Sequence, residues 1–314
     1  ALHWMAAAQV LGKPMTVSEW NMEPFPLPDR HVLPLYVAAV ASHQGWDALM
    51  HYAYSQESFQ GMGAPSNWHS WNDPSLLPML GAAAILYRQH HVQQAINTYV
   101  FDPGAKVFFG KAISPDTAPA LRAAMERGRL VIAMPQTPEL PWLKREALPP
   151  KSIVIKSAET SLLRDGAGEA VSDTGELMRD WRRGVYVINT PQTQAALGWL
   201  GGRRVKFKDV ELLISTRSAS IAVQSLDGLP VGQSHEILLS VGTRSQPQDG
   251  RRMPFRVEPL RGTVTIQAPP GLKVYRNGPL NQWLELEPGE VTVKDSRYVL
   301  TFDGKKSIQW VTLR

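Results

Sequence analysis

The chain contains no cysteine among its 314 residues, and it has no long apolar run. The absence of cysteine excludes disulfide bonds, thiolate metal sites and a cysteine nucleophile. A helix that spans a membrane needs about 20 predominantly apolar residues, so we expect no membrane partner. The net charge is only +5, and the lysines and arginines are scattered along the chain. This distribution indicates solvated charge, and we expect no nucleic-acid partner.

Common motifs for metal binding and serine chemistry are also missing. The eight histidines show no HExxH spacing, and the adjacent His90 and His91 would face different directions on a helix. Ser234 lies in the segment GQSHE, which lacks the second glycine of a nucleophile elbow. We therefore expect no bound metal and no cofactor, and an esterase-type hydrolase ranks third among the functions considered.

Tryptophan is abundant, with ten residues. An indole ring offers a large, flat apolar face, and sugar-binding clefts use such faces to stack on pyranose rings. The tryptophan content therefore favours carbohydrate as a ligand.

The first 96 residues alternate between helical and strand patterns, which is typical of an α/β region. Asp73 is the expected N-cap of a helix that begins at Pro74. The expected elements are a helix over Ala1–Leu11, a strand over Met15–Ser18, a helix over Leu33–His43, a strand over Ala48–Tyr54 and a helix from Pro74 to Leu86.

The pattern changes after residue 96. We expect a connecting α/β segment over residues 97–150, with a strand over Val100–Phe109, a helix over Ser114–Arg127 and a strand over Leu130–Met134. Residues 151–314 contain many short alternating runs separated by turn dipeptides such as Asp227-Gly228 and Asp303-Gly304. This spacing predicts an antiparallel β-sandwich.

One carboxylate stands at the end of a short apolar run. Glu19 follows Met15–Ser18, and a polar, proline-rich loop from Glu23 to Asp29 comes next. A carboxylate placed in this way can attack an anomeric carbon and form a glycosyl-enzyme. Spacing alone favours a simpler role, in which Glu19 pairs with a lysine or caps the next helix.

Two segments resemble a known family. PMTVSEWN, residues 14–21, resembles the seventh strand of clan A glycoside hydrolases, where a glutamate at the strand end is the nucleophile. GWDALMHYAYS, residues 45–55, is similar to the eighth strand of that clan. Residues 183–202 resemble the accessory β-domain of bacterial cellulase-like or β-galactosidase-like proteins. Because Ser18, and not asparagine, precedes Glu19, the resemblance implies that Glu19 is the nucleophile and not the acid/base.

The resemblance also implies a fold class, α/β followed by all-β. Residues 1–96 are expected to form a partial (β/α)8 TIM barrel with strands seven and eight and their helices. Residues 97–150 connect this part to the accessory β-sandwich of residues 151–314.

Several aromatic side chains are expected near the nucleophile. The resemblance places strand-eight residues near the cleft, and the loop that follows carries a candidate sugar-stacking pair; for each of these residues, packing against the scaffold is the alternative. The expected substrate-binding residues are Trp20, Trp46, His51, Tyr52, Tyr54, Trp68 and Trp71.

A retaining glycosidase also needs a second carboxyl group about 5–5.5 Å from the nucleophile. In clan A this acid/base ends the fourth strand, for which the chain has no counterpart. The spacing of the local carboxylates, Glu23, Asp29, Asp47 and Glu57, does not favour any of them. We therefore expect the acid/base outside this chain, in a missing N-terminal half of the barrel or in a homo-oligomer partner.

The leading function is retaining hydrolysis of β-glycosidic bonds in oligo- or polysaccharides. The alternative is a non-catalytic carbohydrate-binding or structural module. Polysaccharide-active relatives are commonly secreted, so we expect a secreted or periplasmic location, with the cytoplasm as the alternative.

Overall fold

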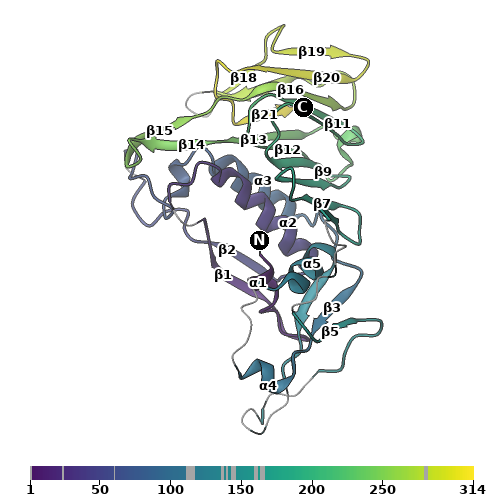
Figure 1. The fold of residues 1–314 in the computed structure, drawn as a ribbon. Helices are drawn as coiled ribbons and strands as arrows, with labels where there is room; N and C mark the ends of the chain where they lie inside the picture. The colour runs from purple at the N-terminus through teal and green to yellow at the C-terminus, as the bar shows by residue number, and fades with distance from the viewer. Residues whose placement is uncertain are drawn as a thin grey trace. The chain divides into compact units, whose positions relative to one another are not determined.

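The structure, a computed structural model, is mostly β, with 36% of residues in strands and 18% in helices (Figure 1). It describes residues 2–22, 25–59, 61–110, 117–135, 138, 141–142, 146–158, 162, 167–278 and 282–314. The chain divides into two compact units: unit 1 contains Ala1–Ser18, Val40–Leu49 and Val92–Arg182, and unit 2 contains Glu19–Ala39, Met50–His91 and Arg183–Arg314. The division falls within three elements, β1 (Thr16–Trp20), α2 (Leu33–Gln44) and β2 (Ala48–His51).

Unit 1 is built around a three-stranded parallel sheet with the order β4-β3-β5. Val100 and Val131 from neighbouring strands, together with Ala133, form a small apolar core. The helix α5 packs against β4 and α1. The elements of this unit are α1 (His3–Ala6), β3 (Thr98–Phe101), α4 (Gly104–Phe108), α5 (Pro119–Arg127), β4 (Arg129–Ile132), β5 (Ile153–Ile155), β6 (Glu169–Val171) and β7 (Leu177–Asp180), the last two an antiparallel pair.

A buried glutamine holds the end of α2 in place within unit 1. Gln44 Nε2 donates to the carbonyl oxygens of Met125 at 3.0 Å and Gly128 at 2.7 Å. Its Oε1 accepts the N–H of Leu130 at 2.7 Å. One fully buried side chain thereby satisfies three backbone groups where α5 ends and β4 begins.

Unit 2 contains two antiparallel sheets of several strands, besides a two-stranded hairpin. The unit 2 strands of the larger sheet have the order β18-β17-β21-β13-β12-β9-β8, and the smaller sheet has the order β10-β11-β16-β20-β19. The strands of the larger sheet are β8 (Val185–Asn189), β9 (Thr193–Gly198), β12 (Ala219–Ser225), β13 (Ile237–Thr243), β17 (Val274–Asn277), β18 (Trp283–Glu285) and β21 (Trp310–Leu313). Those of the smaller sheet are β10 (Arg203–Lys206), β11 (Val210–Ile214), β16 (Arg261–Gln267), β19 (Val291–Lys294) and β20 (Arg297–Asp303).

The two sheets share one hydrophobic core. Alternate residues of β11 and β20, such as Leu212 and Leu300, are buried together with Ile221 of β12 and Leu239 of β13. The two-residue period of a strand places these side chains on one face of each sheet. Apolar burial on this scale is the main stabilising contribution to unit 2.

The opposite face of the larger sheet is covered by α3 (Leu77–Arg88), which lies along β12 and β13 (Figure 1). Gln224 Nε2 of β12 donates to the carbonyl oxygen of Ala82 at 3.0 Å. At Gly242 of β13, an added Cβ would come within 2.7 Å of Met79. Glycine at this position lets the helix approach the sheet closely, so every residue of β12 is buried.

A hairpin of β14 (Ser245–Gln248) and β15 (Arg252–Val257) forms a separate two-stranded sheet. One face of it contacts Arg30, which is fully buried and lies over the ring of Phe255 at 5.4 Å. Arg30 Nε donates to Asp73 Oδ2 at 2.7 Å, and its Nη2 donates to Ser245 Oγ at 2.9 Å. The guanidinium group therefore connects the turn that precedes α2, the segment that precedes α3, and the hairpin.

The strands β1 and β2 form another two-stranded sheet. The N–H of Asp47 donates to the carbonyl oxygen of Met15, and the N–H of Tyr52 donates to that of Trp20. From the first bond to the second, both the donor and the acceptor move five residues toward the C-terminus, so the two strands are parallel. Glu19 and Trp20 lie at its carboxyl end.

The partial (β/α)8 TIM barrel expected from the sequence is wrong. The described residues show no repeating βα pattern of the barrel type, and their sheets are not closed. The pair β1–β2 stands as a two-stranded sheet, the parallel strands of unit 1 form another sheet, and the remaining paired strands are antiparallel. Among the described residues, no helix has the length and apolar character needed to cross a membrane.

Candidate functional site

The candidate site lies in unit 2, at the carboxyl ends of β1 and β2. The side chain of Val17, two residues before Glu19, is buried, whereas Glu19 is exposed. Among the residues that the structure describes, none forms a hydrogen bond or an ion pair with the Glu19 carboxylate. The carboxylate is therefore open to solvent at the end of a strand, which is a position where it can meet a ligand.

Trp20 and His51 form the base of the site. The two half-buried rings meet edge to face, with their centroids 4.8 Å apart. His51 Nε2 lies 2.7 Å from Ser70 Oγ. Burial lowers the pKa of His51 to about 4, so the imidazole is neutral at pH 7. His51 therefore supports the Trp20 ring without adding charge next to Glu19.

The site continues into a segment that we call the aromatic loop, residues 52–59 and 61–72. The backbone N–H groups of Ser70 and Trp71 donate to the carbonyl oxygens of Ala53 and Tyr54. These two bonds close the base of the loop next to β2.

Asn72 and a glycine shape the interior of the aromatic loop. Asn72 Nδ2 donates to the carbonyl oxygens of Met62 at 2.8 Å and Ala64 at 3.3 Å. Gly63 has a φ of +63°, and a Cβ there would lie 2.9 Å from the Asn72 amide. Both the left-handed conformation and the close approach require glycine.

The aromatic loop presents several exposed rings. The Tyr54 and Phe59 rings are 6.0 Å apart, and the Phe59 and Trp71 rings are 5.5 Å apart. Trp71 itself is half-buried. The exposed fractions are 39% for Tyr52, 51% for Tyr54, 63% for Phe59 and 46% for Trp68.

Sequence reasoning missed Phe59, although an aromatic residue in a glycine-rich loop is a signal that could have found it. Trp46, which the sequence places with the substrate-binding residues, is only 4% exposed and belongs to unit 1. The structure thus brings Glu19, Trp20, His51 and the aromatic loop together in unit 2, and Trp46 is not part of this group.

The carboxylates that the sequence offers as a possible acid/base are engaged in other contacts. Asp47 Oδ2 accepts the N–H of Met15 at 2.8 Å, within unit 1. Asp29 Oδ1 lies 3.5 Å from Arg244 Nε. Glu57 Oε1 lies 3.4 Å from His69 Nε2 in the aromatic loop. Glu23 lies outside the described residues.

A serine–histidine–aspartate group does occur in unit 2, but it is buried. His31 Nδ1 lies 2.8 Å from Ser220 Oγ, and its Nε2 lies 3.2 Å from Ser218 Oγ and 3.7 Å from Asp29 Oδ1. Burial lowers the pKa of His31, and the nearby His31 ring lowers the pKa of Asp29. Because His31 and Ser220 are fully buried, a substrate cannot reach them. The arrangement fixes the turn of Arg30–Val32 on β12 and does not support serine hydrolysis.

Comparisons with known proteins return nothing similar. No known family, no curated protein and no solved structure matches the chain. Within the described part of the chain, no group of three or more His, Asp or Glu side chains is arranged to hold a metal ion.

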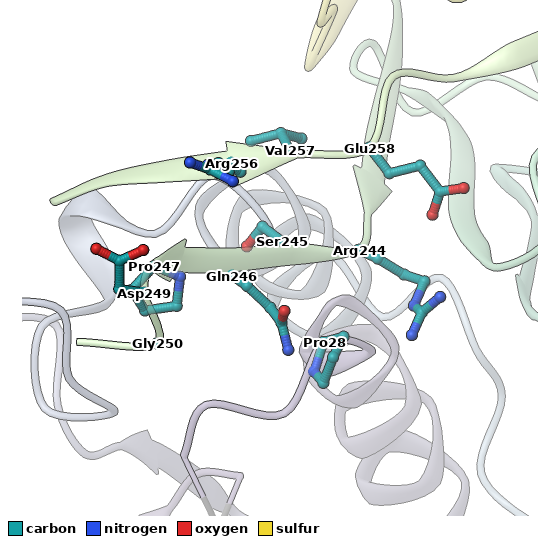
Figure 2. Close-up of a pocket in the computed structure, with 10 residues that line it drawn as sticks. All are labelled: Pro28, Arg244, Ser245, Gln246, Pro247, Asp249, Gly250, Arg256, Val257 and Glu258. Atoms are coloured by element: carbon teal, nitrogen blue, oxygen red, sulfur yellow. The ribbon is translucent and has the colours of Figure 1, made fainter. Parts of the chain in front are cut away.

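A cavity of about 520 Å³ lies on the β14–β15 hairpin (Figure 2). Polar and charged side chains of both signs line it, including Arg244, Arg256 and Glu258. The predicted site residues, all of which the structure describes, are not part of its lining. Such a mixed lining is typical of a solvated polar hairpin face.

Proposed function

We propose that the surface made by Glu19, Trp20 and the aromatic loop binds carbohydrate, and that Glu19 is the nucleophile of a retaining glycoside hydrolase. One observation carries the proposal: the exposed carboxylate of Glu19 directly precedes Trp20, whose ring contacts His51 at the start of a hydrogen-bonded loop that presents exposed aromatic rings. Aromatic faces bind the C–H surfaces of sugars with little loss of side-chain entropy. A carboxylate beside them can reach an anomeric carbon.

In the proposed reaction, a carboxylate oxygen of Glu19 forms a bond to the anomeric carbon as the glycosidic C–O bond breaks. The leaving oxygen takes a proton from a general acid, and water later hydrolyses the glycosyl ester. The acid/base carboxyl group belongs, in this proposal, to polypeptide outside this chain or to a partner subunit. The secreted or periplasmic location stays a prediction.

The nucleophile can be tested without the acid/base. A dinitrophenolate leaving group departs without protonation, and a 2-fluoro substituent slows hydrolysis of the glycosyl ester. We expect dinitrophenyl 2-deoxy-2-fluoro-β-glycosides (gluco, galacto, manno and xylo) to add one glycosyl mass to the chain, with the label on Glu19. Intact-mass spectrometry followed by peptide mapping measures this.

The controls are two matched substitutions. Glu19→Gln should abolish the label, whereas Glu236→Gln, which removes an exposed carboxylate of unit 2 outside Glu19, Trp20 and the aromatic loop, should retain it. A label that survives in Glu19→Gln would remove Glu19 from the mechanism. The absence of any label with the whole sugar panel would also contradict the proposed chemistry.

The second candidate is a non-catalytic carbohydrate-binding module. It is favoured by the contacts of Asp29, Asp47 and Glu57, because these carboxylates are already engaged in hydrogen bonds or ion pairs. This function predicts oligosaccharide binding that Trp68→Ala weakens, with no covalent label. Calorimetric titration with β-linked oligosaccharides separates the two candidates.

A further inference from the structure

The side chain of Asn21 joins three segments of the candidate site. It lies two residues after Glu19, and its Nδ2 donates to the carbonyl oxygen of Tyr52 at 2.9 Å, at the end of β2. The same Nδ2 donates to the carbonyl oxygen of Asn67, next to Trp68. Its Oδ1 accepts the N–H of Met22 at 2.7 Å.

We infer that Asn21 is a positioning residue that holds Trp68 at a fixed place relative to Glu19. This inference rests on the proposed function, because Asn21 would set the distance between the proposed nucleophile and an aromatic ring that binds the sugar. The residue itself does not contact the reacting atoms in the proposed mechanism.

The chemistry of the amide group explains why asparagine suits this position. Two carbonyl oxygens face Nδ2 and one N–H faces Oδ1, so the site requires two donors and one acceptor on a short side chain. Aspartate has the same shape, but it would place a carboxylate oxygen against two carbonyl oxygens.

The hydrogen bonds around Trp68 show how Asn21 attaches this part of the aromatic loop to the end of β1. The N–H of Trp68 donates to Ser66 Oγ at 3.1 Å, so this contact lies within the loop. The Asn21–Asn67 hydrogen bond is a side-chain contact that joins residues 66–68 to the end of β1. A binding surface held in its bound conformation before the ligand arrives loses less entropy on binding.

The test is a double-mutant cycle between Asn21 and Trp68. The concentration of fluoroglycoside that gives the half-maximal labelling rate, and the maximal rate, are measured for wild type, Asn21→Ala, Trp68→Ala and the double variant. We expect Asn21→Ala to raise the half-maximal concentration about tenfold, as the loss of the two hydrogen bonds that Nδ2 donates suggests, with a maximal rate within about threefold of wild type. In the Trp68→Ala background, Asn21→Ala should add little, because both changes remove the same contribution.

Two further variants separate positioning from general stability. Asn21→Asp keeps the side-chain volume and the acceptor for the Met22 N–H but loses both donors, so it should show at least the same increase as Asn21→Ala, with circular dichroism as the check that the fold is kept. Asn97→Ala removes a hydrogen bond to Asp173 in unit 1 and should leave labelling unchanged.

Suppose that wild type is labelled. The positioning role is then contradicted if Asn21→Ala leaves the half-maximal concentration unchanged, or if the effects of Asn21→Ala and Trp68→Ala are additive. If wild type takes no label but binds oligosaccharide, the same cycle measured by calorimetric titration decides the role of Asn21. If wild type neither labels nor binds, the proposed function fails, and the inference fails with it.

Discussion

Arg30 and Asp73 form an ion pair in which both side chains are fully buried. They are 43 positions apart in the chain, and no local pattern in the sequence links them. The sequence predicts Asp73 as the N-cap of a helix, but α3 begins at Leu77 after Leu76 as its N-cap. Asp73 Oδ1 instead accepts the N–H of Ser75 at 2.9 Å, while Oδ2 binds Arg30.

Removing one member of this pair leaves a buried charge without its counter-charge. We expect Asp73→Asn to lower the free energy of unfolding by about 3–5 kcal/mol. Denaturant titration followed by circular dichroism measures the change. The control is Asp249→Asn, which removes an exposed ion pair with Arg252 and should cost at most about 1 kcal/mol. Equal losses in the two variants would contradict this account.

Part of the candidate site could be predicted residue by residue. The pattern of residues 15–19 predicts a carboxylate at the end of a short strand, and Glu19 is the penultimate residue of β1. The contacts of Asn21 and Phe59 could not be predicted, because they depend on how the aromatic loop folds back on β1 and β2. The catalytic role of Glu19 stays a prediction.

At the scale of elements, local patterns predict some helices closely and others poorly: the helix expected over Ala1–Leu11 is only His3–Ala6, which is α1. The helix expected over residues 33–43 is confirmed as α2. The strand expected over Val100–Phe109 is wrong, because β3 ends at Phe101 and residues 104–108 form α4. The Asp102-Pro103-Gly104 sequence is a turn signal that divides the apolar run, and Gly104 has a φ of +74°.

Gln44 shows how one side chain joins elements of unit 1. Gln44→Leu keeps a similar volume but leaves two carbonyl oxygens and one N–H without their partner. We expect a loss of about 2–4 kcal/mol in the free energy of unfolding. Hydrogen exchange followed by mass spectrometry should show faster exchange at residues 125–132. Gln282→Leu, at an exposed position, is the control and should have almost no effect.

At the scale of the whole molecule, the barrel was predicted wrongly for a physical reason. A short apolar strand followed by a helix is a local pattern, and it is compatible with a barrel or with several small sheets. Which one forms depends on pairing between distant strands. In this chain, β3 pairs with β4 and β5 in their own sheet, and β1 pairs with β2.

Four histidines, three of them buried and one half-buried, make stability depend on pH. Burial lowers the pKa of His31, His43, His51 and His91 below the ordinary value of 6.5. Above pH 6.5 these groups are neutral in both states. As the pH falls from 6.5, the unfolded chain binds protons before the folded chain does, so stability decreases.

We therefore expect a lower urea midpoint at pH 5 than at pH 7.5, with at most about 1.4 kcal/mol lost per histidine for each pH unit. Burial raises the pKa of Glu176, so this one carboxyl group makes the fold more stable as the pH falls. Its effect is opposite to that of the four histidines and is smaller than their sum. His31→Gln should reduce the pH dependence. A midpoint that is constant or rises between pH 7.5 and pH 5 would contradict the assignment.

The outer strand of the smaller sheet of unit 2, β10, has consequences for how the protein behaves in concentrated solution. Its exposed side chains Lys206 and Arg204, the latter 3.4 Å from Glu211 Oε1 through its Nε, place positive charge along a row of backbone groups that another chain could otherwise pair with. Two such edges repel each other when they approach. The Debye screening length is about 8 Å at physiological ionic strength and becomes shorter as salt is added. Storage in high salt therefore favours the edge-to-edge aggregation that these two cations oppose.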